Sequence, residues 1–498
     1  MLRSFTRFLL VPALLCSTLS QAQTAAKPMN LKVRIRGLAK DSIVLLANYY
    51  GDKQFIQDTV KADAAGNVLF KSDKPMERGI YLVVIPSKKN KFFEVILTEN
   101  QNFSMETDTS ANAVQNMKVT GSPENKIFYD YLQYISLAQK RLSPLTDKKK
   151  KFEEQKNKDS VAAVQKKIDD LDLEVKAYKL AFIKNNPENF MAKVFRAMRE
   201  PEIPKEIPAP YNANDSLKKV FSYLYYKAHF FDGMDWTEEG LVRTPVFHNN
   251  LVQYMDKLTP QHPDSIILAC DYLIGKAKGC KEQFKYTTHH LTYKYETIKV
   301  MCFDRIFVHL VDKYYKTGQA FWLDEKQTEK IIKRADQLRY SLCDNNPANM
   351  ILQDTLGKTV SLQQIKAKYT IIAFWEPSCS HCKKEMPILK KEYDELKKYG
   401  LEIFAMNTED DPAAWRKFIR ENKLNWINGI AKDAQERATY KYYYDIYSTP
   451  VLFLLDENKK IIAKRLDPIQ MGNVIRKKEK LPLKPEEKKT GADKQGHN

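Results

Sequence analysis

The sequence is poor in three features that would narrow its function directly: long hydrophobic runs, acidic residues and clustered metal ligands. Beyond the apolar run Phe8–Leu15, no stretch approaches the roughly 20 apolar residues of a transmembrane helix. His289 and His290 are adjacent, but no histidine or carboxylate follows at the i+3 or i+4 spacing of a helical metal site. We therefore expect no membrane-spanning helix in the mature chain, no metal and no cofactor.

Acidic residues are outnumbered, with 62 Asp and Glu against 81 Lys and Arg, which gives a net charge of +19. Such a surplus is compatible with nucleic acid or an anionic membrane as partner. The lysines, however, are spread over expected helices that are also rich in Glu and Asp, which favours a solvated basic surface and no nucleic-acid partner. Residues 476–498 are basic with almost no apolar side chains, so we predict a disordered tail there.

Residues 1–22 have the pattern of a secretory signal peptide: two arginines, an apolar run, and small residues before an expected cleavage after Ala22. Cys16 could indicate a lipoprotein, but the preceding Leu15 is bulkier than lipoprotein signals use. We expect an exported protein of the periplasm or cell envelope.

Cysteine is also scarce, with seven in the chain and six after the signal. In an oxidising compartment, thiols pair unless they are kept reduced. Four of the six lie in sequence with a helical pattern and without metal-ligand spacing, namely Cys270, Cys280, Cys302 and Cys343. We expect these four to be buried free thiols, and a Cys270–Cys280 disulfide is the alternative.

The last two cysteines lie in the most informative stretch of the chain. Thr370–Trp375 is an apolar run typical of a buried strand, and residues 376–378 interrupt it before an expected helix. Cys379 and Cys382 then fall on the first helical turn, where free N–H groups and the helix dipole favour a thiolate. The C-x-x-C spacing also allows a reversible disulfide, so the stretch indicates thiol–disulfide exchange.

This context resembles the thioredoxin superfamily, and more closely its TlpA/ResA-like branch of exported oxidoreductases. The matching segments cover roughly residues 346 to 475. They are the lead-in Gly357–Leu362, Phe374-Trp375 before the cysteines, Lys383 to Glu385 and Pro387 after them, and Ser448-Thr449-Pro450 before the strand Val451–Leu455.

The resemblance implies a role for each site residue. Cys379 would attack and Cys382 would resolve the mixed disulfide. Pro450 would be a cis-proline facing the cysteines, and the Thr449 backbone would pair with an extended substrate strand. Trp375 would shield the disulfide, although an ordinary core tryptophan would look the same.

Two positions depart from the thioredoxin pattern. The buried Asp of thioredoxins is replaced by Ala373, but Glu385 occupies the position of a ResA-like Glu that exchanges a proton with the resolving thiol. A surface Glu is the alternative. His381 resembles the histidine of strongly oxidising DsbA-type sites, which conflicts with the reductase character of the wider match.

The region before this domain divides into two parts. Residues 23–119 read as about seven short strands, hence a small β-sandwich or barrel, and 120–345 as an all-α domain that begins at the N-cap Ser122. Within it, Leu291 to Tyr315 reads as one helix. Val161 to Phe182 follows a heptad pattern, which predicts a helical hairpin or, alternatively, a dimerisation seam. This order resembles multidomain Bacteroidetes proteins with a C-terminal thioredoxin-like domain.

The sequence thus predicts a multidomain chain: a β-domain, an all-α middle domain and a C-terminal α/β thioredoxin-like fold over 346–475. Its expected function is reduction or isomerisation of protein disulfides, with protein thiols as substrates and a membrane-bound electron donor. A DsbA-like oxidant, a redox-inactive binding module and a peroxidase are the alternatives. The last would need a Pro-x-x-x-Thr-x-x-Cys motif, which is absent.

Overall fold

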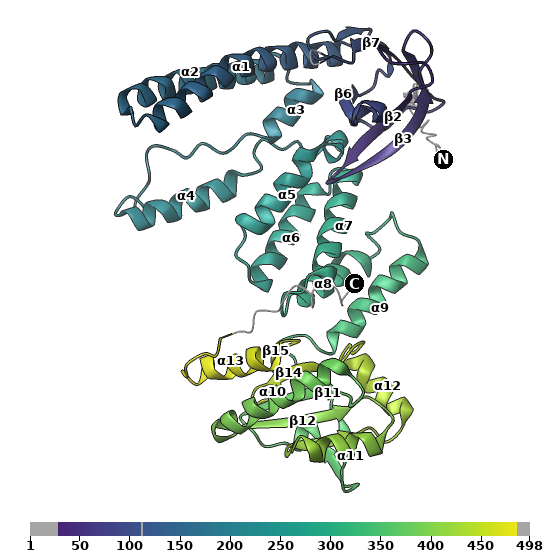
Figure 1. Ribbon diagram of the computed structural model, residues 1–498, viewed down its shortest axis with the longest axis vertical. Helices are drawn as coiled ribbons and strands as arrows, with labels where there is room; N and C mark the ends of the chain where they lie inside the picture. The colour runs from purple at the N-terminus through teal and green to yellow at the C-terminus, as the bar shows by residue number, and fades with distance from the viewer. Residues whose placement is uncertain (1–27, 111–112, 486–498) are drawn as a thin grey trace, which may run out of the picture. The chain divides into compact units, whose positions relative to one another are not determined.

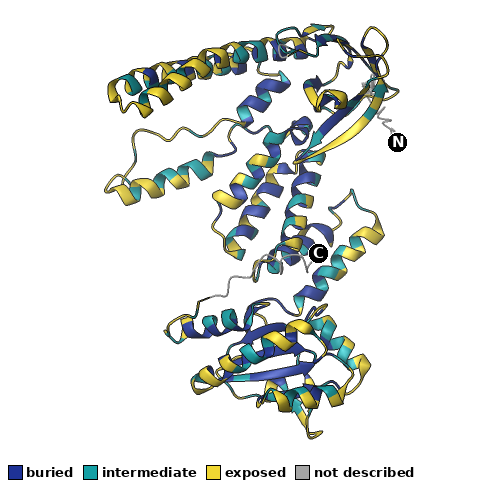
Figure 2. Cartoon of the chain, in the orientation of Figure 1, coloured by how far each residue is buried: buried dark blue, intermediate teal, exposed yellow. Residues whose placement is uncertain are grey.

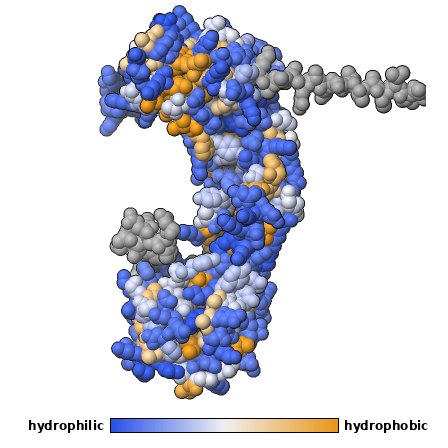
Figure 3. Space-filling view, turned by 90° about the vertical axis from the view of Figure 1, so that its right-hand side faces the viewer, coloured by the Kyte–Doolittle hydropathy of each residue, from blue (hydrophilic) through white to orange (hydrophobic). Residues whose placement is uncertain are grey.

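The computed structural model describes residues 28–110 and 113–485, and the chain forms two compact units, Met1–Arg196 and Ala197–Asn498 (Figure 1). The expected signal peptide, including Cys16, lies outside the described residues. Among the residues described, no helix is both long and apolar enough to cross a membrane. The face drawn in Figure 3 is largely hydrophilic, as the charged composition leads one to expect.

The first unit begins with a β-sandwich, as predicted. Its two four-stranded sheets have the orders β4-β1-β7-β8 and β3-β2-β5-β6. Strand β1 alternates buried Leu31 and Val33 with exposed Lys32 and Arg34, because successive side chains of a strand point to opposite faces. The strands are β1 Met29–Arg36, β2 Ile43–Tyr50, β3 Lys53–Lys61, β4 Asn67–Ser72, β5 Gly79–Ile85, β6 Lys91–Leu97, β7 Asn102–Asp108 and β8 Lys118–Thr120.

A helical hairpin follows, formed by α1 (Pro123–Glu154) and α2 (Lys158–Asn185). The Ser122 side chain caps α1 by accepting a hydrogen bond from the Asn125 N–H, as expected. In α2 the heptad positions Val164, Leu171 and Phe182 are buried, and Tyr178 stacks on Tyr134 of α1 with ring centroids 3.7 Å apart. Packing on α1 therefore accounts for the heptad pattern within one chain.

The second unit opens with more helices, and one of them differs from the prediction. The expected continuous helix over Leu291–Tyr315 is interrupted, because the chain leaves the helix at Ile298 and Cys302 has a positive φ of 68°. Helix α3, Phe190–Ala197, falls at the end of the first unit in the sequence. The helices that follow are α4 Asp215–His229, α5 Pro245–Lys257, α6 Pro263–Ala277, α7 Lys281–Thr297, α8 Asp304–Leu310 and α9 Glu325–Arg339.

The prediction of four free thiols is half right. Cys270 and Cys280 are free and buried, so the alternative Cys270–Cys280 disulfide is wrong. Cys302 and Cys343 form a disulfide, which links the α7–α8 loop to the segment after α9. Both of these cysteines lie outside helices, and they are 41 positions apart in the sequence, so local spacing could not pair them.

The C-terminal part is built on a seven-stranded mixed sheet of order β10-β9-β13-β12-β11-β14-β15. Its central strand β11 is parallel to β12 and antiparallel to β14, and all its residues are buried (Figure 2). The elements are β9 Ile351–Asp354, β10 Thr359–Ser361, β11 Tyr369–Trp375, α10 Ser380–Leu396, β12 Leu401–Asn407, α11 Pro412–Glu421, β13 Ile427–Ile430, α12 Ala434–Tyr443, β14 Val451–Leu455, β15 Ile461–Lys464 and α13 Pro468–Lys478.

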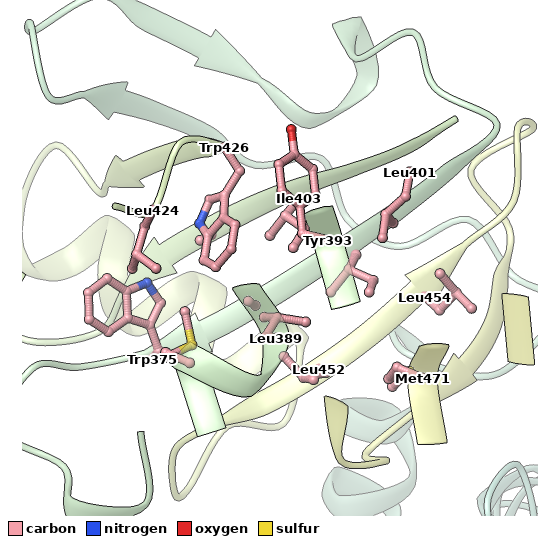
Figure 4. Close-up of a cluster of buried hydrophobic side chains, with 14 of the residues drawn as sticks. Trp375, Leu389, Tyr393, Leu401, Ile403, Leu424, Trp426, Leu452, Leu454 and Met471 are labelled. Carbon is pink, nitrogen blue, oxygen red and sulfur yellow. The ribbon is translucent and has the colours of Figure 1, made fainter. Parts of the chain in front are cut away.

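Helices cover both faces of this sheet. On one face, Leu389 and Tyr393 of α10 and Met471 of α13 pack against residues of β11 and β12, among them Ile403 (Figure 4). On the other face, Phe374 of β11 packs with residues of α12 and the segment that follows it. A strand buried on both faces carries a continuous apolar run, which is why Thr370–Trp375 was recognisable from sequence.

The predicted start of the disordered tail at residue 476 is wrong. Helix α13 continues to Lys478, and the buried Arg476 side chain binds Glu392 of α10 at 2.5 Å. Lys484 Nζ also lies 2.7 Å from Glu392 and 2.6 Å from Glu395. Composition alone indicated a tail because the acidic partners of these basic residues lie far away in the sequence. Residues 486–498 lie outside the described part of the chain.

Candidate active site

The dithiol site forms where β11 gives way to α10. After β11 the segment 376–378 turns the chain, and Cys379 becomes the N-cap residue of the helix. The Cys379 Sγ accepts a hydrogen bond from the Cys382 N–H at 3.3 Å. A cysteine sulfur thus takes the place of the oxygen acceptor that usually caps a helix, and it lies at the positive end of the helix dipole.

The two thiols, both in the reduced form, have opposite environments. Cys379 is half-buried, whereas Cys382 is fully buried. Burial acts to raise the pKa of Cys379, but interactions with Cys382, with the Thr449 side chain and with the His381 backbone outweigh it, and the pKa falls below its usual value of 9.0. Burial raises the pKa of Cys382 to about 12. Near neutral pH only Cys379 is poised to react as a thiolate.

The loop before β14 closes the site from the opposite side. The Thr449–Pro450 peptide bond is cis, as the family resemblance implies. The Cys379 thiol donates a hydrogen bond to the Thr449 carbonyl oxygen at 3.2 Å. The Thr449 hydroxyl is buried and, within the described residues, has no hydrogen-bond partner at ordinary distance. It nevertheless lies near enough to both sulfurs to lower the pKa of each thiol.

The other residues singled out from the sequence lie at different distances from this centre. Glu385 is half-buried on α10, one turn beyond Cys382. The His381 side chain is exposed, and its contribution to Cys379 comes from its backbone. Trp375 is fully buried in the same hydrophobic cluster as Cys382 and packs on Phe418, with ring centroids 5.0 Å apart. Its position is that of a core residue directly beneath the dithiol.

Sequence reasoning missed two glutamates beside the site. Glu376 forms a backbone hydrogen bond to the Cys382 sulfur, and its carboxylate accepts one from Thr408 Oγ1 at 2.8 Å. Glu409 accepts a hydrogen bond from the Ser378 N–H at 3.4 Å. Because β11 and β12 are parallel, their carboxyl ends lie at one edge of the sheet, so the polar residues that follow β12 were a usable signal.

Across the described residues, no group of three or more His, Cys, Asp or Glu side chains is placed to hold a metal ion. The site brings together two thiols, a hydroxyl, a carbonyl oxygen and nearby carboxylates. That inventory suits the transfer of protons and of disulfide bonds.

A mixed sheet covered by helices, with a dithiol at a helix N-terminus facing a cis-proline loop, defines the thioredoxin-like class. Comparison with known proteins gives the same class. Residues 345–464 match the AhpC/TSA family, whereas 145–341 and 29–128 match two domains of unknown function, DUF5106 and DUF4369.

Several curated relatives are named thiol-disulfide oxidoreductase ResA, among them two from Bacillus species. The one from Bacillus subtilis is 31% identical over 114 residues, which cover 23% of this chain and 62% of the relative. The one from Bacillus cereus is 29% identical over 116 residues, 23% of this chain and 65% of the relative. The chain thus spans less than two thirds of the length of either.

A solved domain from Cytophaga hutchinsonii, described as belonging to a possible thiol-disulfide isomerase, is 37% identical. The match covers 28% of this chain and 94% of that one, with a TM-score of 0.26. The C-terminal region of the present chain is a thioredoxin-like domain related to the ResA thiol–disulfide oxidoreductases.

Proposed function

We propose that this protein is an exported thiol–disulfide oxidoreductase that reduces or isomerises disulfides of other proteins through Cys379 and Cys382. The observation that carries the proposal is the asymmetry of the pair. One thiol is half-exposed with a lowered pKa, and the other is fully buried with a pKa raised to about 12. Such a pair separates attack from resolution, because only a thiolate is nucleophilic.

The reaction proceeds in two exchanges. The Cys379 thiolate attacks one sulfur of a substrate disulfide, which forms a mixed disulfide and releases the other substrate sulfur as a thiolate. Cys382 then loses its proton and attacks the Cys379 sulfur, which releases the second substrate thiolate and leaves the Cys379–Cys382 disulfide. Two electrons pass to the substrate, and both substrate sulfurs are protonated from solvent.

The second exchange requires deprotonation of a thiol with a strongly raised pKa. Glu385, one turn further along α10, is the candidate acceptor of that proton. The Thr449 hydroxyl favours the thiolate at both sulfurs and so assists both exchanges. The Thr449 backbone at the site also supplies an edge to which an extended substrate segment can pair.

Export and electron supply complete the proposal. The N-terminal signal pattern favours the periplasm or cell envelope, where a reductase needs a supply of electrons. A membrane-bound dithiol protein is the class of donor that would regenerate the reduced pair. In isomerisation no net electrons are needed, because Cys379 is released when a substrate thiol displaces it.

The direct test is catalysis of disulfide reduction by the mature chain, residues 23–498. Insulin reduction by dithiothreitol, followed by turbidity, serves as the assay, with Cys379→Ala as the comparison. We expect the parent chain to accelerate the reduction and the variant to match the uncatalysed rate. Equal rates for parent and variant would favour the binding-module alternative and overturn the proposal.

A further inference from the structure

The loop that carries Thr449 is held from two sides. Arg465 of the thioredoxin-like domain pairs with the Asp445 carboxylate at 2.8 Å, and helix α9 of the middle region contacts the loop from outside that domain. Asp445 begins this loop in a left-handed conformation, with a φ of 56°, and its side chain is 5% exposed. Arg334 of α9 binds the Asp445 carboxylate with both terminal nitrogens, at 3.2 Å for Nη2–Oδ2 and closer for Nη1–Oδ1. Such a two-pronged, partly buried pair fixes orientation as well as distance.

A second contact lies two residues further along the same loop. The Tyr447 hydroxyl donates a hydrogen bond to Gln337 Oε1 of α9 at 2.8 Å. Arg334 donates to the same oxygen at 3.3 Å, and its guanidinium lies 5.8 Å from the centroid of the Tyr447 ring. Arg334 and Gln337 thus hold the loop at residues 445 and 447, and Thr449 follows two positions later.

Further contacts near helix α9 join the middle region to the thioredoxin-like domain. Lys464 of β15 forms an ion pair with Asp304 and donates to the Ser341 carbonyl oxygen at 2.6 Å. The Cys302–Cys343 disulfide closes the same region, and the Asp344 N–H donates to the Ile461 carbonyl oxygen at 2.9 Å. The region of α9 that carries Arg334 is therefore held to the domain that carries Asp445 by contacts other than the Arg334–Asp445 pair.

We propose that Arg334 and Gln337 are positioning residues for the dithiol site, which hold the 445–449 loop so that the Thr449 carbonyl and hydroxyl groups stay beside the two sulfurs. The inference rests on the proposed oxidoreductase function and gives the middle region a part in it. Neither residue touches the reacting sulfurs. Both act through Asp445 and Tyr447, whose loop also presents the backbone on which an extended substrate would pair.

Release of the loop should affect both tasks of Thr449. If Thr449 moves away, the Cys379 sulfur loses both a hydroxyl that favours the thiolate and a carbonyl acceptor that favours the thiol, so the fraction ionised at a given pH changes. If its backbone becomes disordered, a substrate must order it on binding, and KM rises. We therefore expect KM to rise by about tenfold, together with a change in the pH at which Cys379 ionises.

The experiment uses the full mature chain with Arg334→Ala, Gln337→Ala and Tyr447→Phe. Cys379 alkylation by iodoacetamide is followed against pH, and KM and kcat are measured with insulin. Arg339→Ala is the matched control, because Arg339 lies on the same helix but pairs with Asp312 and Asp336. Arg334→Lys, which keeps the charge but not the fork, should restore part of the loss.

The expected result is a shifted alkylation profile and a raised KM in the first three variants, with parental values for Arg339→Ala. Tyr447→Phe removes one hydroxyl from a residue that is 74% exposed, so it decides the question if Arg334→Ala fails to fold. Parental profiles in Gln337→Ala and Tyr447→Phe, or equal shifts in Arg339→Ala, would overturn the inference. If the parent itself lacks Cys379-dependent activity, the proposed function fails instead.

Discussion

The Cys379 thiol donates a hydrogen bond to the Thr449 carbonyl oxygen across 3.2 Å, although the two residues are 70 positions apart in the sequence. The contact joins the start of α10 to the loop before β14. It exists because β11 and β14 are adjacent in the sheet, so that the segment after one strand and the segment before its antiparallel neighbour meet at one edge. The order of the strands, rather than any local motif, completes the site.

The first prediction separates the roles of the two cysteines. Cys379→Ala should abolish exchange, since no second thiolate is accessible. Cys382→Ala should instead accumulate mixed disulfides with substrate, because attack proceeds and resolution does not. Mass spectrometry after incubation with a disulfide-bonded protein measures this. Cys270→Ala, at a free and buried thiol, is the control and should react as the parent does. Mixed disulfides on Cys382 in the Cys379→Ala chain would contradict the assignment.

The second prediction concerns pH. Because the pKa of Cys379 lies below 9.0, its alkylation rate should rise with pH and level off earlier than that of an ordinary thiol. With a pKa of about 12, Cys382 should stay unmodified in the folded dithiol across pH 6 to 9. Iodoacetamide labelling with peptide mass spectrometry measures both sites in one sample. A midpoint for Cys379 above pH 9, or equal labelling of the two sites, would refute the proposed asymmetry.

Local sequence patterns were sufficient to predict the dithiol site but not its surroundings. The apolar run of β11, the break and the C-x-x-C helix start are all encoded within about twenty consecutive residues, and each element forms for local reasons. The contacts of Asp445 and Arg476 are not predictable in this way. Each places a charged residue in a buried position whose partner lies on another element.

The Cys302–Cys343 disulfide illustrates the same limit. Its cysteines occupy a loop and a turn, and their pairing depends on how α7, α8 and α9 pack. The interruption of the expected helix at 298–303 belongs to the same feature, since this segment turns the chain and brings Cys302 to its partner. The helical pattern of apolar residues in the sequence spans residues 298–303 because α7 and α8, on either side, both bury apolar side chains.

The third prediction tests this disulfide. In the mature chain, residues 23–498, with Cys379→Ala and Cys382→Ala, the Cys302–Cys343 pair is the one disulfide among the described residues that a reductant can open. Opening a loop of 41 residues should lower the free energy of unfolding by about 4 kcal/mol on the chain-entropy account. Urea unfolding with and without dithiothreitol measures the difference. The same chain with Cys302→Ser and Cys343→Ser should be insensitive to dithiothreitol, and sensitivity there would show that another effect of the reductant is responsible.

The fourth prediction concerns the corrected C-terminal boundary. Truncation after Ile475 removes Arg476 and Lys484 and leaves Glu392, which is 2% exposed, as an unpaired buried carboxylate. Loss of one partner of a buried pair typically costs about 3–5 kcal/mol. Truncation after Pro485 keeps these contacts and should match the parent in thermal unfolding. Equal stability of the two truncated chains would mean that the α10–α13 ion pairs contribute little.

The last prediction is the reduction potential of the Cys379–Cys382 pair, which distinguishes a reductase from an oxidant. A DsbA-like value, roughly −120 mV, requires strong stabilisation of the reduced form, whereas thioredoxin lies near roughly −270 mV. The imidazole of His381 is exposed to water, and the groups that lower the pKa of Cys379 are the side chains of Cys382 and Thr449 and the backbone of Cys382 and His381. We therefore expect a reduction potential nearer that of thioredoxin.

The substitution His381→Ala should shift this potential by less than about 30 mV, which corresponds to about 1.4 kcal/mol for a two-electron couple. Equilibration with thiol–disulfide buffers of known potential measures both proteins. A strongly oxidising parent whose potential falls sharply in His381→Ala would mean that the imidazole controls the thiolate and that the protein donates disulfides rather than removing them.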